Sequence, residues 1–61
     1  MPIVQIELKE VRTVDQKRQL VEKMTQAVVD SVSVKAESVT VIIREMSKEN
    51  HAVGGKLDYD Q

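Results

Sequence analysis

The chain has 61 residues, a formal net charge of −1 and no cysteine, which excludes disulfides and thiolate metal sites. It has one histidine, no lysine/arginine block and a single aromatic ring, which argues against a multi-histidine metal site and against nucleic-acid binding. No apolar run approaches the roughly 20 residues of a membrane span, and no signal peptide is recognised. We therefore expect a cytoplasmic protein with neither a membrane nor a nucleic acid as partner.

The chain begins Met1-Pro2. Aminopeptidases usually remove a methionine that precedes a small residue, which would leave Pro2 with a free secondary amine. An α-amino group titrates near ~8, and apolar surroundings or a nearby arginine lower its pKa. A terminal Pro2 is thus a candidate base near neutral pH. With Met1 attached, the same nitrogen is an amide, and Pro2 would only begin a strand, as proline commonly does.

A strand is predicted over residues 2–9, where Val4, Ile6 and Leu8 alternate with polar residues. Strict alternation is typical of a half-buried strand. Residues 10–13 then connect this strand to a helix.

The helix is predicted from Val14 to Val32. Thr13, with Gln16 three positions later, matches a capping box. The apolar residues recur at helical spacing and predict one buried stripe, formed by Leu20, Val21, Met24, Ala27, Val28 and Val32. A helix of this length spans about 28 Å, enough to cross back over a short sheet.

Residues 33–38 are a polar connection, and residues 39–45 predict a second strand. Strand, helix and strand form a β-α-β unit with parallel strands and a right-handed crossover. The side chains of the second strand alternate between two faces, one with Val39, Val41 and Ile43 and the other with Thr40, Ile42 and Arg44. The β-branched residues favour burial on both faces.

Gly54-Gly55 predicts the turn of a short C-terminal β-hairpin, because this turn needs positive φ angles. The whole chain, residues 1–61, is then a single α+β domain. One helix covers only one face of a two-stranded sheet, so the face that carries Ile42 needs another cover. A chain this short rarely supplies a sufficient core by itself. We therefore expect the fold to be completed by oligomerisation with copies of itself.

Several stretches, in this order and spacing, are similar to the 4-oxalocrotonate tautomerase family. They are Met-Pro-Ile-Val at the start, Glu10-Val11-Arg12-Thr13 with Asp15-Gln16-Lys17, Val39-Thr40-Val41-Ile42-Ile43 with Glu45-Met46, and Val53-Gly54-Gly55. The resemblance covers residues 1–57. It implies a β-α-β subunit with a C-terminal hairpin, assembled as a dimer and commonly as a hexamer. It also implies enol–keto tautomerisation without metal or cofactor, in which an N-terminal proline carries the proton.

Two candidate residues match the family directly. The resemblance implies that Pro2 corresponds to the catalytic proline and that Arg12 corresponds to the arginine that binds a substrate carboxylate. Bidentate pairing explains why an arginine suits that role. Without the resemblance, Arg12 would be read as a solvated loop charge.

Four further positions differ from the family or add to it. Thr40 stands where the family has a second arginine, and His51 stands where it has an aromatic residue. The small residue beside Arg12 is usually glycine, and here it is Val11. Arg44 lies on the strand face of Thr40, about 13 Å further on, and either serves a shifted pocket or pairs with a neighbour's glutamate. His51 is either a donor to the substrate or an ordinary loop residue.

Two functions remain open from the sequence. The first is a tautomerase for a small enolisable oxo acid, with Pro2 as proton shuttle and Arg12, Thr40, Arg44 and His51 as substrate-binding candidates. The second is a non-catalytic oligomeric scaffold, or a small-acid binding protein, with a degenerate tautomerase site. Pro2 and Arg12 favour the enzyme, whereas Thr40, His51 and a retained Met1 favour the scaffold.

Overall fold

The computed structural model describes residues 1–9 and 12–61. Glu10 and Val11 lie outside the described residues. They are the first two residues of the expected connection between the first strand and the helix, and Val11 is the position at which the family usually has glycine. Two parallel strands, β1 (Ile3–Lys9) and β2 (Thr40–Met46), pair along their whole length, with Ile3 opposite Thr40 and Lys9 opposite Met46. This is the predicted parallel pair.

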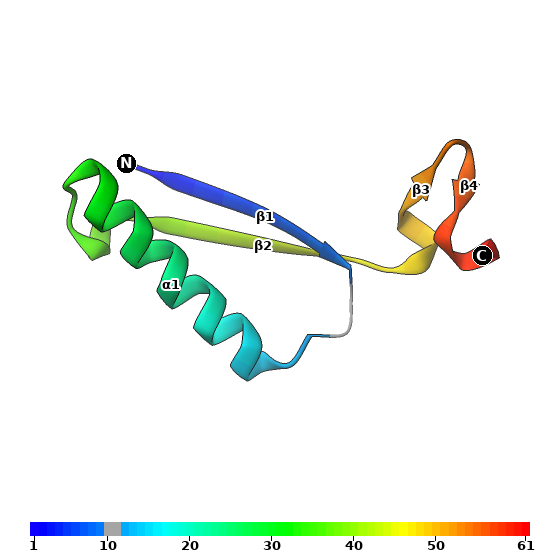
Figure 1. Cartoon of the computed structure of the whole chain (residues 1–61), viewed down its shortest axis with the longest axis horizontal. Helices are drawn as coiled ribbons and strands as arrows, with labels where there is room; N and C mark the ends of the chain where they lie inside the picture. Colours follow the sequence, from blue (N-terminus) through cyan, green and yellow to red (C-terminus); the bar gives the residue numbers. More distant parts are fainter. Residues whose placement is uncertain (10–11) are drawn as a thin grey trace.

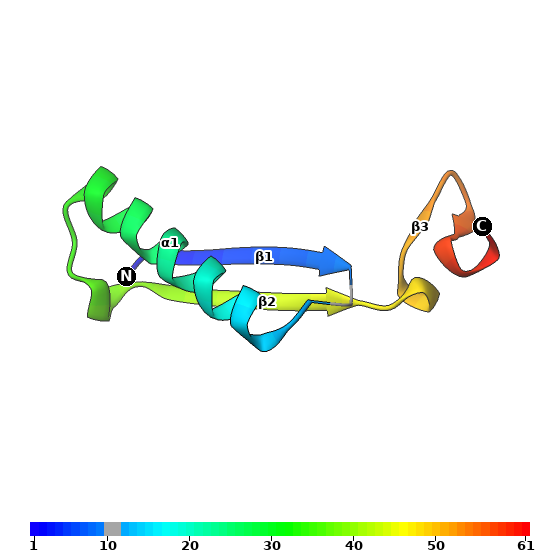
Figure 2. The same cartoon turned by 60° about the horizontal axis from the view of Figure 1, so that its bottom comes forward.

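The helix α1 (Val14–Val32) lies across one face of the two strands (Figures 1 and 2). Seen with α1 in front and the strands pointing up, β2 lies to the right of β1, so the crossover is right-handed as predicted (Figure 2). The predicted capping box starts the helix: Gln16 N–H donates to Thr13 Oγ1 over 3.1 Å, and Thr13 N–H donates to Gln16 Oε1 over 3.0 Å. At the other end, Ser33 caps the helix in the left-handed conformation, with φ 57°.

The side chains between helix and sheet are only half-buried. Val4, Ile6 and Leu8 face α1 from β1, as their alternation predicted. The predicted helix stripe is wrong at two positions, because Ala27 and Val32 are exposed. The half-buried side of α1 includes Thr25 and Val29 instead, so Ala27 lies at the edge of that side. Val32 is the last residue of the helix, where the chain turns away from the sheet. The remaining members of the stripe are half-buried: Leu20, Val21, Met24 and Val28.

The opposite face of the sheet has no covering element among the described residues. It carries Ile3, which is 55% exposed, and Ile42, which is 36% exposed. No side chain in the described part of the chain is fully buried. The expected burial of β2 on both faces is therefore not reached within one chain.

Three short 3₁₀ turns and a hairpin complete the described part of the chain. The turns are η1 (Ala36–Ser38), η2 (Lys48–Asn50) and η3 (Asp58–Asp60). β2 begins one residue later than predicted, because the N–H of Val39 donates to the carbonyl of Ala36 in η1. It also ends one residue later, at Met46, which pairs with Lys9 of β1.

The antiparallel hairpin, β3 (Ala52–Val53) and β4 (Lys56–Leu57), stands away from the β-α-β unit beyond the end of β2 (Figure 1). Gly54 and Gly55 have φ angles of 61° and 82°, which confirms the positive-φ turn. No helix of the described residues is long and apolar enough to cross a membrane.

Candidate active site

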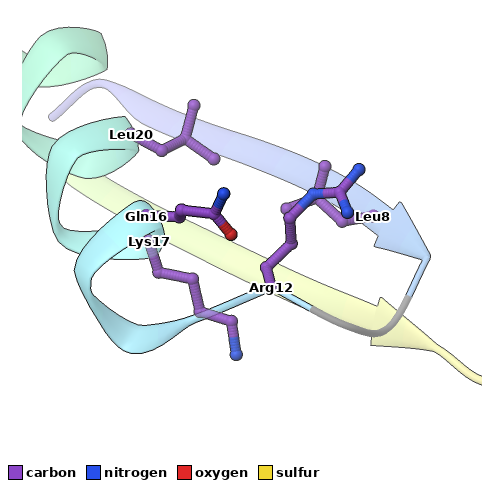
Figure 3. Close-up of a pocket in the computed structure, with 5 residues that line it drawn as sticks. All are labelled: Leu8, Arg12, Gln16, Lys17 and Leu20. Carbon is purple, nitrogen blue, oxygen red and sulfur yellow. The ribbon is translucent and has the colours of Figure 1, made fainter.

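Arg12 lies at a pocket between the C-terminal end of β1 and the first turns of α1 (Figure 3). The pocket holds about 260 Å³. Arg12 immediately precedes the capping residue Thr13, so the capping box that starts α1 also fixes the backbone next to Arg12. The side chains that line the pocket are Leu8, Arg12, Gln16, Lys17 and Leu20.

The lining of this pocket combines apolar and cationic groups. Leu8 and Leu20 offer apolar surface, and the guanidinium of Arg12 extends towards Leu8 (Figure 3). Lys17 forms an ion pair with Glu45 of β2, and its ammonium points away from the pocket. The pair ties the first turns of α1 to β2, so the pocket wall is fixed from two elements. Such a site suits a small carboxylate with an apolar body.

Pro2 and Thr40 lie together at the opposite end of the sheet. The backbone N–H of Thr40 donates to the carbonyl oxygen of Pro2 over 3.0 Å. Pro2 precedes the seven-residue β1 and Arg12 follows it. Seven residues of strand span about 23 Å. A single chain therefore does not bring Pro2 and Arg12 to the same small molecule.

Arg44 lies on the uncovered sheet face, opposite Glu7 on the neighbouring strand. Its Nη1 is 3.9 Å from Glu7 Oε1, and both side chains are more than half exposed. Within one chain, the glutamate beside Arg44 is Glu7 of the adjacent strand.

His51 forms the base of the hairpin together with Asp58. Its Nδ1 is 2.8 Å from Asp58 Oδ2, and its carbonyl accepts from the N–H of Asp58 over 2.9 Å. Asp58 Oδ2 also lies 3.0 Å from the ammonium of Lys9, at the end of β1. The hydrogen bond from Lys9 holds the pKa of the Asp58 carboxyl below its usual range, with His51 adding to that effect and burial opposing it.

Sequence reasoning missed Asp58, Lys9 and the apolar lining at Leu8 and Leu20. The hairpin register could have found Asp58, because Ala52 opposite Leu57 places residue 51 opposite residue 58. Among the described residues, no three histidine, cysteine, aspartate or glutamate side chains gather in a way that could hold a metal ion.

The chain matches a family model described as tautomerase enzyme over residues 2–59. It is 46% identical over 56 residues to the 2-hydroxymuconate tautomerase of Bacillus subtilis (strain 168), covering 92% of this chain and 90% of that protein.

Solved structures agree with this match. YwhB, a homologue of 4-oxalocrotonate tautomerase, has 43% identity and a TM-score of 0.92, with 98% of each chain covered. A heterohexamer 4-oxalocrotonate tautomerase from Chloroflexus aurantiacus J-10-fl has 27% identity and a TM-score of 0.87, with 98% of this chain and 97% of that chain covered. The β-α-β fold and the matches along nearly the whole chain place it in the 4-oxalocrotonate tautomerase family.

Proposed function

We propose that this protein is a tautomerase that interconverts the enol and keto forms of a small oxo acid. The observation that carries the proposal is the position of Arg12 in a pocket of about 260 Å³ with leucine side chains on its wall. An arginine in such a pocket suits one carboxylate attached to a small apolar body. The relatives are described as tautomerases, which favours the enzyme over the scaffold.

Pro2 is the proposed proton carrier once Met1 has been removed. Its neutral amine takes the proton from the enol oxygen, and the resulting ammonium returns that proton to the carbon, so that no proton is gained or lost over the cycle. Arg12 binds the carboxylate and holds the enol in line with Pro2. No cofactor takes part in this sequence.

The remaining candidates have smaller proposed roles. Thr40, beside Pro2, offers a hydroxyl in place of the family arginine, and a neutral donor stabilises an anionic oxygen less than a guanidinium does. His51 contacts the substrate from the hairpin. We assign Arg44 no substrate contact, because its guanidinium lies beside Glu7 on the open face of the sheet.

The proposed site is shared between subunits. Pro2 and Arg12 lie at opposite ends of β1, so the Pro2 of one copy must meet the Arg12 of another. The uncovered sheet face, with Ile3 and Ile42 exposed, offers apolar surface for that association. We propose a homo-oligomer of 61-residue domains, most simply a hexamer, and the heterohexameric relative supports that size.

Mixing two variants of low activity tests the shared site. Pro2→Ala subunits retain Arg12, and Arg12→Ala subunits retain Pro2. Co-refolding equal amounts should restore about one quarter of wild-type activity on phenylpyruvate enol, because each site draws its two residues from different subunits at random. All proteins must be prepared without Met1, as checked by intact mass.

The unmixed variants are the controls for this experiment. If the mixture is no more active than the two variants alone, Pro2 and Arg12 do not act on the substrate from different subunits. If the Met-free wild-type protein turns over no enol substrate, the proposed tautomerase function itself is wrong.

A further inference from the structure

Gln16 takes part both in the start of α1 and in the wall of the Arg12 pocket. Its backbone N–H donates to Thr13 Oγ1 over 3.1 Å, and its side-chain Oε1 accepts from the N–H of Thr13 over 3.0 Å. The same side chain lines the pocket together with Arg12. The capping box therefore positions a side chain of the pocket as well as starting the helix.

The capping box also determines which end of the Gln16 amide is open to a ligand. The backbone N–H of Thr13 can only donate, so the amide atom that it meets must be the oxygen. The NH₂ group is then on the other branch of the amide, and Figure 3 shows it on the side of Leu20. Among the described residues, no hydrogen bond from this Nε2 is found. Gln16 is an exposed residue, so a ligand in the pocket can reach this donor.

A carboxylate in this pocket needs more donors than one arginine supplies. An ionised carboxylate has about four acceptor positions, and a bidentate guanidinium such as that of Arg12 fills two of them. The ammonium of Lys17 is paired with Glu45 and points away from the pocket. The capping box already uses the backbone N–H groups of Thr13 and Gln16. The side-chain NH₂ of Gln16 is therefore the donor best placed to assist Arg12.

We propose that Gln16 is a specificity-determining residue whose side-chain NH₂ donates to the substrate carboxylate beside Arg12. The identity of that carboxylate as a substrate group rests on the proposed tautomerase function, whereas the donor role concerns any small carboxylate in the pocket. One cation and one neutral donor suit a single carboxylate on a body that contacts Leu8 and Leu20. An alcohol of the same shape gains less, because hydrogen bonds to a charged acceptor are stronger.

Phenylacetate tests the donor role without turnover, because it has a carboxylate and no enol. Gln16→Met removes the amide at similar side-chain length and should weaken phenylacetate binding to the Met-free protein about 5-fold, the effect of one hydrogen bond. NMR titration measures this affinity. Binding of 2-phenylethanol, which lacks the carboxylate, should change little. Gln16→Met also removes one half of the capping box, so a second variant must separate the donor from the cap.

Gln16→Glu is that second variant. A glutamate at this position still accepts from the N–H of Thr13, so the urea midpoint should stay near that of wild type. Its carboxylate repels phenylacetate and competes for Arg12, so binding should weaken about 10-fold or more. Gln19→Glu, which adds the same charge to α1 outside the pocket lining, is the matched control and should leave phenylacetate binding nearly unchanged.

The two variants decide the proposal together. Weaker phenylacetate binding in both supports the donor role. If only Gln16→Met weakens binding, Gln16 acts through the helix cap. If only Gln16→Glu does, Gln16 lies near the carboxylate without donating to it. Either result, or no binding of phenylacetate to wild type, overturns the proposal.

Turnover of phenylpyruvate enol separates this proposal from the tautomerase function. Gln16→Met should raise KM by about the same factor as it weakens phenylacetate binding, with kcat nearly unchanged. A Met-free wild type that turns over the enol, with the same KM in Gln16→Met, would keep the tautomerase function and reject the role of Gln16. A wild type that binds phenylacetate through Gln16 but turns over no enol would do the reverse.

Discussion

The backbone N–H of Thr40 donates a hydrogen bond to the carbonyl oxygen of Pro2 over 3.0 Å. The first paired positions of the two strands are Ile3 and Thr40. The bond therefore holds Pro2 to the sheet, although Pro2 lies one residue before β1. The pyrrolidine ring fixes the φ angle of Pro2 itself. The direction of the Pro2 nitrogen is therefore set by the backbone, and it is independent of the side chain at position 40.

Replacing Pro2 tests the proton carrier. In Met-free protein, Pro2→Ala leaves a primary amine that is less constrained and has a different basicity, so kcat should fall by at least about 10²-fold while KM changes little. Steady-state kinetics on phenylpyruvate enol measure both quantities. Some residual turnover by the new amine is expected.

The matched control for Pro2 is wild-type protein that retains Met1. Its Pro2 nitrogen is an amide and cannot accept a proton, so this form should be inactive although its fold is unchanged. Equal activity of the processed and unprocessed forms, with intact mass confirming each, would exclude the proline mechanism.

Thr40→Arg should shift the substrate preference towards dicarboxylates. Wild type has one proposed carboxylate-binding arginine, so we expect it to prefer phenylpyruvate to 2-hydroxymuconate. The Thr40 side chain is exposed on the open face, and its backbone bond to Pro2 survives the change. A second guanidinium beside Pro2 should raise kcat/KM for 2-hydroxymuconate by about 10-fold or more.

Arg44→Gln is the matched control for this prediction. Arg44 lies on the same strand face four residues further on and pairs with Glu7. Its replacement should leave kcat/KM for both phenylpyruvate and 2-hydroxymuconate nearly unchanged. A selective loss of dicarboxylate turnover in Arg44→Gln would instead place Arg44 in the substrate site.

Acid should remove the contribution of Asp58 to stability. In the folded chain the pKa of Asp58 lies below its ordinary value of 3.8, chiefly because of the hydrogen bond from Lys9. The unfolded chain therefore binds a proton at this carboxylate more readily than the folded chain does. The stabilisation is complete above about pH 5 and is lost as the pH falls through 3.8 to the lower folded-state pKa. Urea midpoints of wild type and Asp58→Ala should therefore differ most at pH 6, and the difference should shrink as the pH falls below 3.8. A constant difference across this range would show that the ionised carboxylate is not the stabilising group.

Local patterns predicted the strands and the helix, because each element carries its own signal. Alternation marked the side of β1 that faces α1, and Thr13 with Gln16 marked the first turn of the helix. The error at Ala27 has a different origin. Which edge of a helical stripe is covered depends on how α1 is seated on the sheet, and that is a tertiary property.

The site was only partly readable from the sequence. Pro2 and Arg12 could be named from the resemblance, and their separation follows from the length of β1. The link between His51 and Asp58 requires the hairpin register, and the link from Asp58 to Lys9 requires the hairpin to be placed against the end of β1. Contacts of this kind join distant segments and leave no periodic pattern.

Ser33→Gly should stabilise the protein, since Ser33 ends α1 with φ 57°, a left-handed conformation that costs a residue with a Cβ about 1 kcal/mol relative to glycine. Its N–H donates to the carbonyl of Val29 over 3.1 Å, and this bond does not depend on the side chain. Glycine keeps the bond and removes the strain, although part of the gain is offset by the greater freedom of the unfolded chain. The expected net gain is about 0.5 kcal/mol per subunit, measured by urea unfolding at fixed protein concentration. Ser31→Gly, two residues earlier inside the helix, is the matched control and should destabilise by about 0.5 kcal/mol. Equal destabilisation by both changes would show that residue 33 is not held in the left-handed conformation in solution.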